Sequence, residues 1–131
     1  MGPQICATFV LCGFQVSTWS RRGVEQHLGG FEREKKLLSR RLRGDAQEVG
    51  GLSVVTDIND FMPSLTVEVL VEDLKIKSSV VGSLPYDVVE VGLLTNSSSF
   101  APEEIHPCAE ALHFFNPIYA RQFVETTVPR A

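Results

Sequence analysis

Hydrophobic and polar positions along the chain alternate between a spacing typical of helices and a spacing typical of strands. Apolar residues at helical spacing predict a short helix over residues 3–12 that ends at Gly13. Residues 13–19 alternate toward a strand, and residues 20–23 form the expected turn after it. A long, charged, amphipathic helix is then expected from Val24 to Leu42.

The rest of the chain continues this alternation. The strongest predicted strand covers residues 65–71, which are rich in β-branched side chains. The other expected elements are a loop bracketed by Gly44-Asp45 and Gly50-Gly51, a strand at 52–55, a helical turn at 57–61, a helix at 72–84, a strand at 88–94, a loop at 95–99, a helix at 102–109, and two strands near 112–115 and 123–128. Strands that alternate with helices predict an α/β fold, a Rossmann-like, mostly parallel sheet with flanking helices. Any ligand would bind at the carboxyl ends of its strands.

Length, composition and charge narrow the class of protein. At 131 residues, residues 1–131 are expected to form one domain. A hydrophobic content of 44% and a charged content of 21% are typical of a globular protein. The net charge of −4 argues against a nucleic-acid partner. The one basic run, from Glu32 to Arg43, is interleaved with leucines and is interpreted as a solvated helix face.

Cysteine usage and hydropathy bear on the compartment. Cys6, Cys12 and Cys108 form no C-x-x-C pair and are odd in number, which favours buried thiols in a reducing compartment. No apolar run approaches the ~20 residues of a membrane span, and the start at Met1 has no basic region typical of a signal peptide. We therefore expect a cytoplasmic or mitochondrial protein without a membrane partner.

One histidine and one glutamate near the end of the chain are the strongest catalytic candidates. His113 and Glu125 each lie in an apolar, strand-like setting, and a corner at Asn116-Pro117 would bring the two strands together. A carboxylate against an imidazole fixes its tautomer and stabilises the imidazolium, as a general acid/base histidine requires. The competing interpretation is a satisfied core histidine beside two phenylalanines.

The amino-acid sequence of this region resembles that of the 3-hydroxyacyl-CoA dehydrogenase family. The resemblance is carried by His113-Phe114-Phe115-Asn116-Pro117 and by Phe123-Val124-Glu125. Residues 71–77 resemble the stretch after the family's fourth strand, and Thr95-Asn96-Ser97-Ser98-Ser99 resembles its Thr-Asn-Thr-Ser-Ser loop. The match is dense from Leu65 to Glu125 and weaker before Leu52.

The resemblance implies a reaction and the residues that carry it. The family oxidises a 3-hydroxyacyl-CoA to a 3-ketoacyl-CoA in fatty-acid metabolism (β-oxidation) with NAD, so the implied partner is an acyl-CoA substrate. His113 would be the acid/base, Glu125 its dyad partner, and Ser98 the hydroxyl on the reacting oxygen. The implied cofactor-binding residues are Gly2, Ser20, Arg21, Glu72, Lys77, Ser98 and Asn116, and no metal is implied. Taken alone, Glu72 also fits a first-turn helix acid, Lys77 a solvated helix lysine, and Ser98 a plain turn.

Both ends of the chain bear on this resemblance. Met1-Gly2 resembles the last two letters of the family's Gly-x-Gly-x-Met-Gly turn, so we expect an incomplete nucleotide-binding domain that lacks the first strand and the first two glycines. The family's C-terminal helical domain would also be absent after Ala131. A sheet without its first strand has unpaired edges, so a homodimer or a complementing chain is expected, and the chain on its own is expected to be inactive.

The cofactor is NAD by resemblance, but the residues after the strand expected at 13–19, which resembles the family's second strand, also suit NADP. Ser20 stands where the family has the acid that accepts the ribose 2′-OH, and Arg21-Arg22 follow. An arginine at this place suits a 2′-phosphate. The alternative is that Arg21 and Arg22 begin a solvated helix.

Three functions therefore remain open. The first is an NAD(P)-dependent 3-hydroxyacyl-CoA dehydrogenase domain. The second is a non-catalytic Rossmann remnant that acts as a binding or interaction protein. The third is a different NADP-dependent hydroxyacid enzyme, suggested by Ser20-Arg21-Arg22.

Overall fold

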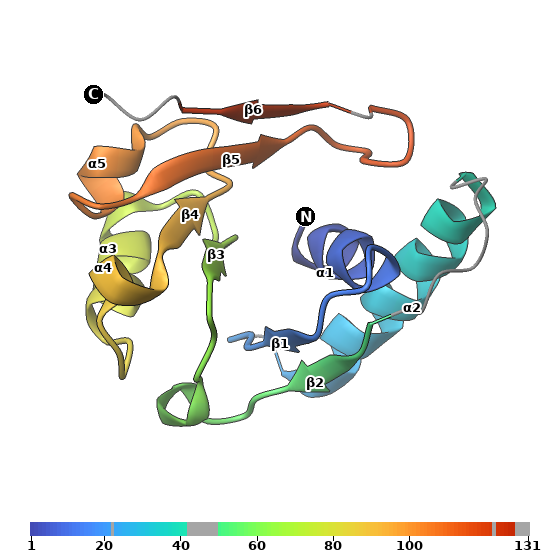
Figure 1. Cartoon of the computed structure of the whole chain (residues 1–131), viewed down its shortest axis with the longest axis horizontal. Coiled ribbons are helices and arrows are strands. Elements are labelled where there is room, and N and C mark those ends of the chain that lie inside the picture. Colours follow the sequence, from blue (N-terminus) through green and yellow to red (C-terminus); the bar gives the residue numbers. More distant parts are fainter. Residues whose placement is uncertain (22, 42–49, 122, 128–131) are drawn as a thin grey trace. The chain divides into compact units, whose positions relative to one another are not determined.

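A computed structural model describes residues 1–21, 23–41, 50–121 and 123–127. Helices alternate with short strands along the chain, and most strand pairs are parallel (Figure 1). The α/β class expected from the sequence is therefore confirmed. The chain divides into two compact units, Met1–Asp60 with Asn116–Gln122, and Phe61–Phe115 with Phe123–Ala131. The single domain expected from the length stays a prediction.

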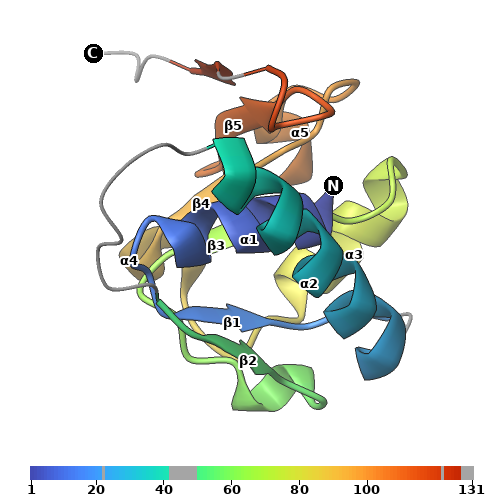
Figure 2. The same ribbon diagram turned by 90° about the vertical axis from the view of Figure 1, so that its right-hand side faces the viewer.

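The first unit contains a parallel strand pair and two helices. Strands β1 (Val16–Thr18) and β2 (Leu52–Val54) pair with Val16 opposite Leu52. Helix α1 (Gly2–Leu11) packs against α2 (Val24–Arg41), as Figure 2 shows, and a short 3-10 helix, η1 (Ile58–Asp60), follows β2. The buried apolar side chains of this unit are Ile5, Ala7, Val10, Phe31, Leu38 and Ile118.

Helix α2 continues through Gly29 and Gly30, although each glycine disfavours a helix by about 1 kcal/mol. The contact with α1 accounts for Gly30, because a Cβ there would lie 3.1 Å from Cγ of Pro3. The apolar stripe of α2 on α1 thus outweighs the low helix propensity of the two glycines.

The second unit holds a sheet of four strands in the order β3-β4-β5-β6. Strands β3 (Thr66–Glu68), β4 (Leu93–Thr95) and β5 (Glu110–Phe114) are parallel, and β6 (Val124–Thr126) runs antiparallel to β5. The helices of this unit are α3 (Leu74–Gly82), α4 (Val88–Val91) and α5 (Pro102–Ile105). Its core is a buried cluster of Val81, Val88, Leu93 and Ile105.

The strand predicted over residues 88–94 is wrong for residues 88–92. The carboxylate of Asp87 accepts a hydrogen bond from the backbone N–H of Val89 at 2.8 Å and caps α4. Gly92 then turns the chain with φ 93°, so that β4 begins only at Leu93. The cap outweighs the strand preference of the valines in this run.

Smaller differences concern bounds and thiols. Strand β3 is shorter than expected, and α3 begins at Leu74 with Asp73 as its N-cap, two residues after the expected start. Cys12 is exposed, so the expectation of buried thiols is wrong for this residue. Three expected features lie outside the described residues: the helix end at Leu42 and Arg43, the loop at Gly44-Asp45, and the strand end at Val128. Within the described ranges, no helix has both the length and the apolar character needed to cross a bilayer.

Candidate active site

His113 and Glu125 lie directly opposite each other in the antiparallel pair β5–β6. The distance from Nδ1 of His113 to Oε2 of Glu125 is 3.2 Å. The imidazole also packs on the ring of Phe115, with 4.4 Å between centroids, and Phe115 packs on Phe123. The histidine side chain is 17% exposed and its partner is 68% exposed. The histidine is therefore mostly buried, whereas its carboxylate partner faces solvent.

This contact determines which ring nitrogen is left for chemistry. When the neutral imidazole donates its Nδ1 proton to Glu125, the lone pair remains on Nε2, which can then accept a proton. The backbone beside the ring is held as well, because the N–H of Phe114 donates to Oδ1 of Asn96 at 2.8 Å. Asn96 follows β4, so the end of one strand orients the end of the next.

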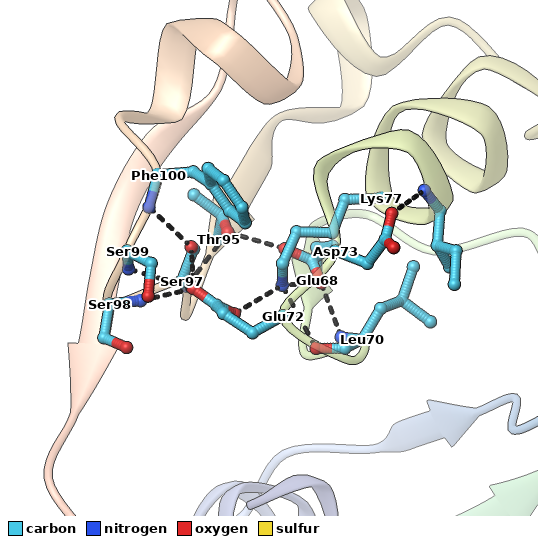
Figure 3. Close-up of polar contacts among 11 residues, drawn as sticks. Glu68, Leu70, Glu72, Asp73, Lys77, Thr95, Ser97, Ser98, Ser99 and Phe100 are labelled. Atoms are coloured by element: carbon cyan, nitrogen blue, oxygen red, sulfur yellow. Dashed lines mark hydrogen bonds and ion pairs between the residues drawn. The ribbon is translucent and has the colours of Figure 1, made fainter.

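A second group of polar residues gathers after β3 and β4 (Figure 3). The Oε1 atom of Glu72 accepts hydrogen bonds from Oγ of Ser97, from the N–H of Ser98 at 3.0 Å and from the N–H of Ser99 at 2.9 Å. Glu72 lies before the N-cap of α3, so the interpretation as a first-turn helix acid is wrong. Its carboxylate instead anchors the hydroxyl-rich loop after β4.

The carboxyl of Glu72 has a strongly lowered pKa. Partial burial acts to raise the pKa, but the hydrogen bonds from Ser97, Ser99 and Lys77, together with the positive charge of Lys77, outweigh burial and lower it from 4.5 to about 2. Glu72 is therefore ionised at neutral pH.

Lys77 is buried, with a side chain only 1% exposed. Its Nζ lies 2.8 Å from Oε1 of Glu68, 3.2 Å from Oε2 of Glu72 and 3.1 Å from the carbonyl oxygen of Leu70. The interpretation as a solvated helix lysine is therefore wrong. An ammonium group has three protons, and here three acceptors surround it.

Glu68 is a member of this network that the sequence reasoning missed. Its Oε1 accepts from Lys77 and from the N–H of Leu70, and its Oε2 accepts from Oγ1 of Thr95 at 2.6 Å. The residue is 5% exposed. One signal could have indicated it, because a glutamate within a β-branched strand is rarely buried unless a cation pairs with it.

The remaining candidates lie in the first unit. Gly2 begins α1, and Met1 makes no side-chain cap, so the N–H groups of Gly2 and Gln4 can face an anion, whereas Pro3 has no N–H group and the N–H of Ile5 donates to the carbonyl oxygen of Met1. Ser20 and Arg21 follow β1. Arg21 is exposed and lies in a turn before α2, which begins at Val24, so the interpretation that Arg21 begins the helix is wrong. Arg22 lies outside the described residues.

Asn116 is held beside the first turn of α1. Its Oδ1 accepts a hydrogen bond from Nε2 of Gln4 at 3.0 Å, and Oε1 of Gln4 accepts from the N–H of Ile118 at 3.0 Å. The peptide bond from Asn116 to Pro117 is cis. Gln4 is thus a second residue that the sequence reasoning missed, and its polarity within an otherwise apolar helix was the available signal.

The structure therefore places the predicted residues in separate groups. One group is the pair His113 and Glu125, and a second joins Glu72, Lys77 and the backbone of Ser98. Between Ser98 and His113 the described part of the chain shows no hydrogen bond. Across residues 1–21, 23–41, 50–121 and 123–127, no group of three or more His, Cys, Asp or Glu side chains could hold a metal ion.

Comparisons with known proteins identify the family of this chain. The family described as 3-hydroxyacyl-CoA dehydrogenase, NAD binding domain, matches residues 1–130. The structure of FadB2 from M. tuberculosis is 26% identical over 96% of this chain and 50% of its own, with a TM-score of 0.74. Among curated protein sequences none matches the chain.

Two further structures share the fold at lower identity. The dehydrogenase part of multifunctional enzyme 1 from C. elegans is 22% identical with a TM-score of 0.72, over 96% of this chain and 32% of its own. FHMPC 5-dehydrogenase, an NAD+-dependent dismutase, is 17% identical with a TM-score of 0.80, over 96% of this chain and 45% of its own. The chain thus spans half or less of the length of each of these structures.

Proposed function

Because the chain belongs to the 3-hydroxyacyl-CoA dehydrogenase family, as an NAD-binding domain of these oxidoreductases, we propose that it carries the cofactor site and the acid/base histidine of an NAD(P)-linked 3-hydroxyacyl-CoA dehydrogenase. The reaction would oxidise the 3-hydroxyl group of an acyl-CoA thioester to a ketone. The observation that carries the proposal is the 3.2 Å contact between Nδ1 of His113 and Oε2 of Glu125.

The residues present fit a dinucleotide. The first turn of α1 has no side-chain cap, and the N–H groups of Gly2 and Gln4 can donate to a phosphate. Ser20, Glu72 and the loop Ser97–Ser99 each follow the carboxyl end of a parallel strand, where nucleotides bind in such folds. The family resemblance assigns cofactor contacts to Gly2, Ser20, Arg21, Glu72, Lys77, Ser98 and Asn116. When bound, the nicotinamide supplies the acceptor for the hydride from the carbinol carbon.

The side chains of this domain would handle the proton and the oxygen. Nε2 of His113 accepts the proton of the substrate hydroxyl, and Glu125 stabilises the imidazolium that results. The hydroxyl of Ser98 donates a hydrogen bond to the reacting oxygen, which becomes the carbonyl oxygen. General acid/base help of this kind contributes about 10²–10⁴ in rate.

Acetoacetyl-CoA reduction tests the proposal. The assay uses the protein purified from its native host, so that any further segment or partner is present, with NADH and with NADPH. We expect turnover that falls by about 10²–10⁴ when His113→Gln is introduced. The matched control is His106→Gln, because His106 lies outside the proposed site and contacts Cys108. Turnover that is equal in the two variants, or absent from the native protein, overturns the catalytic role.

The same preparation separates the two rival functions. A non-catalytic remnant would bind neither NADH nor NADPH with measurable affinity. A different hydroxyacid enzyme would bind the cofactor but prefer a free 3-hydroxyacid to its CoA thioester. Calorimetry with each cofactor, followed by assays with both forms of the substrate, distinguishes these outcomes from the one we propose.

A further inference from the structure

We propose that Glu68 and Lys77 form a buried positioning pair that sets the conformation of the loop Ser97–Ser99. What this loop does in the reaction rests on the proposed function, whereas the positioning itself does not.

The surroundings of Lys77 support a positioning role. The ammonium group is enclosed by Oε1 of Glu68, the carbonyl oxygen of Leu70 and Oε2 of Glu72, at 2.8, 3.1 and 3.2 Å. These three acceptors match its three protons, and the side chain is 1% exposed. A direct contact with a dinucleotide would have to replace one of these bonds. Through Glu72, its more exposed partner, Lys77 is linked to the loop Ser97–Ser99.

Glu68 reaches the loop through Thr95. The hydroxyl of Thr95 donates to Oε2 of Glu68 at 2.6 Å and accepts from the N–H of Ser97 at 3.1 Å. Because the hydroxyl proton is committed to Glu68, the lone pairs of Oγ1 point toward the start of the loop. A carboxylate on β3 thus orients the chain immediately after β4 (Figure 3).

Glu72 holds the rest of the loop. Its Oε1 accepts from Oγ of Ser97 and from the N–H groups of Ser98 and Ser99, and Oγ of Ser97 in turn accepts from the N–H of Phe100 at 3.2 Å. The backbone of Ser98 is therefore fixed while its hydroxyl stays exposed. Lys77 binds both Glu72 and Glu68. The contacts that each glutamate makes with the loop therefore depend on the same cation.

The charge balance of the network explains why Glu68 requires Lys77. The network holds two carboxylates and one ammonium group, and the nearby carboxylate of Asp73 is committed to the N–H of Ile76 at 3.0 Å. Without Lys77, Glu68 would be a buried carboxylate without a cation, which destabilises a fold strongly. Replacing both members by neutral residues removes the penalty of an unpaired buried charge.

The test uses three variants of the full chain. Lys77→Met removes the cation, and Glu68→Gln/Lys77→Met removes the whole pair while avoiding an unpaired buried charge. Lys75→Met is the matched control, because Lys75 is an exposed lysine on the same helix. NMR follows the titration of the Glu72 carboxyl and the amide hydrogen exchange of Ser98 and Ser99. Calorimetry measures NADH and NADPH binding.

In the double variant we expect the pKa of Glu72 to rise from about 2 toward 4.5. The amides of Ser98 and Ser99 should exchange about tenfold faster, and cofactor affinity should fall about tenfold, the equivalent of one charge-assisted hydrogen bond. Lys75→Met should match the wild type in all three readouts. If Lys77→Met does not fold, the double variant still provides these measurements.

Two outcomes overturn the proposal. An unchanged Glu72 titration with unchanged exchange in the double variant would mean that the pair positions nothing. A loss of cofactor affinity with both NMR readouts unchanged would mean that Lys77 contacts the cofactor directly. If instead the NMR readouts shift but the wild type binds no dinucleotide, the positioning holds and the proposed function fails.

Discussion

His113 and Glu125 face each other across β5 and β6, with 3.2 Å between Nδ1 and Oε2. The glutamate side chain is 68% exposed, so water screens the attraction and the pair contributes at most about 1 kcal/mol to folding. The contact is therefore better explained by orientation of the ring than by stability. It leaves Nε2 as the atom that can take a proton.

Glu125→Gln should lower kcat by about 10²-fold and leave KM nearly unchanged, because the amide keeps the shape but cannot balance an imidazolium. Glu110→Gln is the control, since Glu110 is an exposed glutamate on β5, the strand that pairs with β6. Steady-state kinetics of the native protein with acetoacetyl-CoA checks this. Equal kcat values for the two variants would argue against a dyad.

Cofactor choice should favour NADPH over NADH, because Arg21 follows β1 where a 2′-phosphate is recognised. Arg21→Ala should weaken NADPH binding by about tenfold, roughly one charge-assisted hydrogen bond, and leave NADH binding unchanged. Arg33→Ala is the control, because Arg33 is an exposed arginine of α2. Calorimetry measures both affinities, and a wild type that binds NADH more tightly would contradict the preference.

Acid should remove the stability that Glu72 contributes. Its folded pKa, about 2, lies below the ordinary 4.5, so the ionised form is stabilised by folding. The contribution is therefore complete above about pH 4.5 and is lost as the pH falls toward 2. Because the side chain is 36% exposed, screening reduces the effect to the order of 1 kcal/mol.

Denaturant unfolding of the wild type and of Glu72→Gln at a series of pH values measures this contribution. The free energies of unfolding should differ at neutral pH and converge toward about pH 2. Glu103→Gln, at an exposed acid of α5, should show no such convergence. A constant difference between wild type and Glu72→Gln at every pH would contradict the account.

Gly92→Ala should destabilise the second unit by about 1–3 kcal/mol. Gly92 has φ 93° and ψ 138°, and a Cβ there would lie 3.1 Å from Cδ1 of Leu65. Gly82→Ala is the control, because Gly82 ends α3 with open space around it and alanine favours the helix. Denaturant unfolding should rank Gly82→Ala above the wild type and Gly92→Ala below it, and the opposite ranking would show that α4 does not require this turn.

The sequence predicted the parts of the site that depend on local pattern. Two apolar strands joined by a corner at Asn116-Pro117, with His113 on one strand and Glu125 on the other, are enough to predict a pair, and the structure pairs these two residues. The strand at 88–94 failed for a local reason as well. The valines favour a strand, but the N-cap hydrogen bond of Asp87 stabilises helix α4 by about 1 kcal/mol and outweighs that preference.

The network around Lys77 could not be predicted in this way. Lys77 and Glu68 are nine positions apart on a helix and a strand, and Thr95 comes from another strand. Their contact depends on how α3 packs back on the sheet, which no spacing rule specifies. In the sequence, Lys77 has the same pattern as the exposed Lys75 two positions earlier.

The most direct test of the account is the tautomer of His113, measured by long-range nitrogen–proton NMR of the isotope-labelled chain at a pH where the ring is neutral. The account predicts a proton on Nδ1, shared with Glu125, and a free lone pair on Nε2. Glu125→Gln should make the two tautomers more equal in population. A proton on Nε2 in the wild type would mean that Glu125 does not orient the ring for proton transfer, and would contradict the proposed dyad.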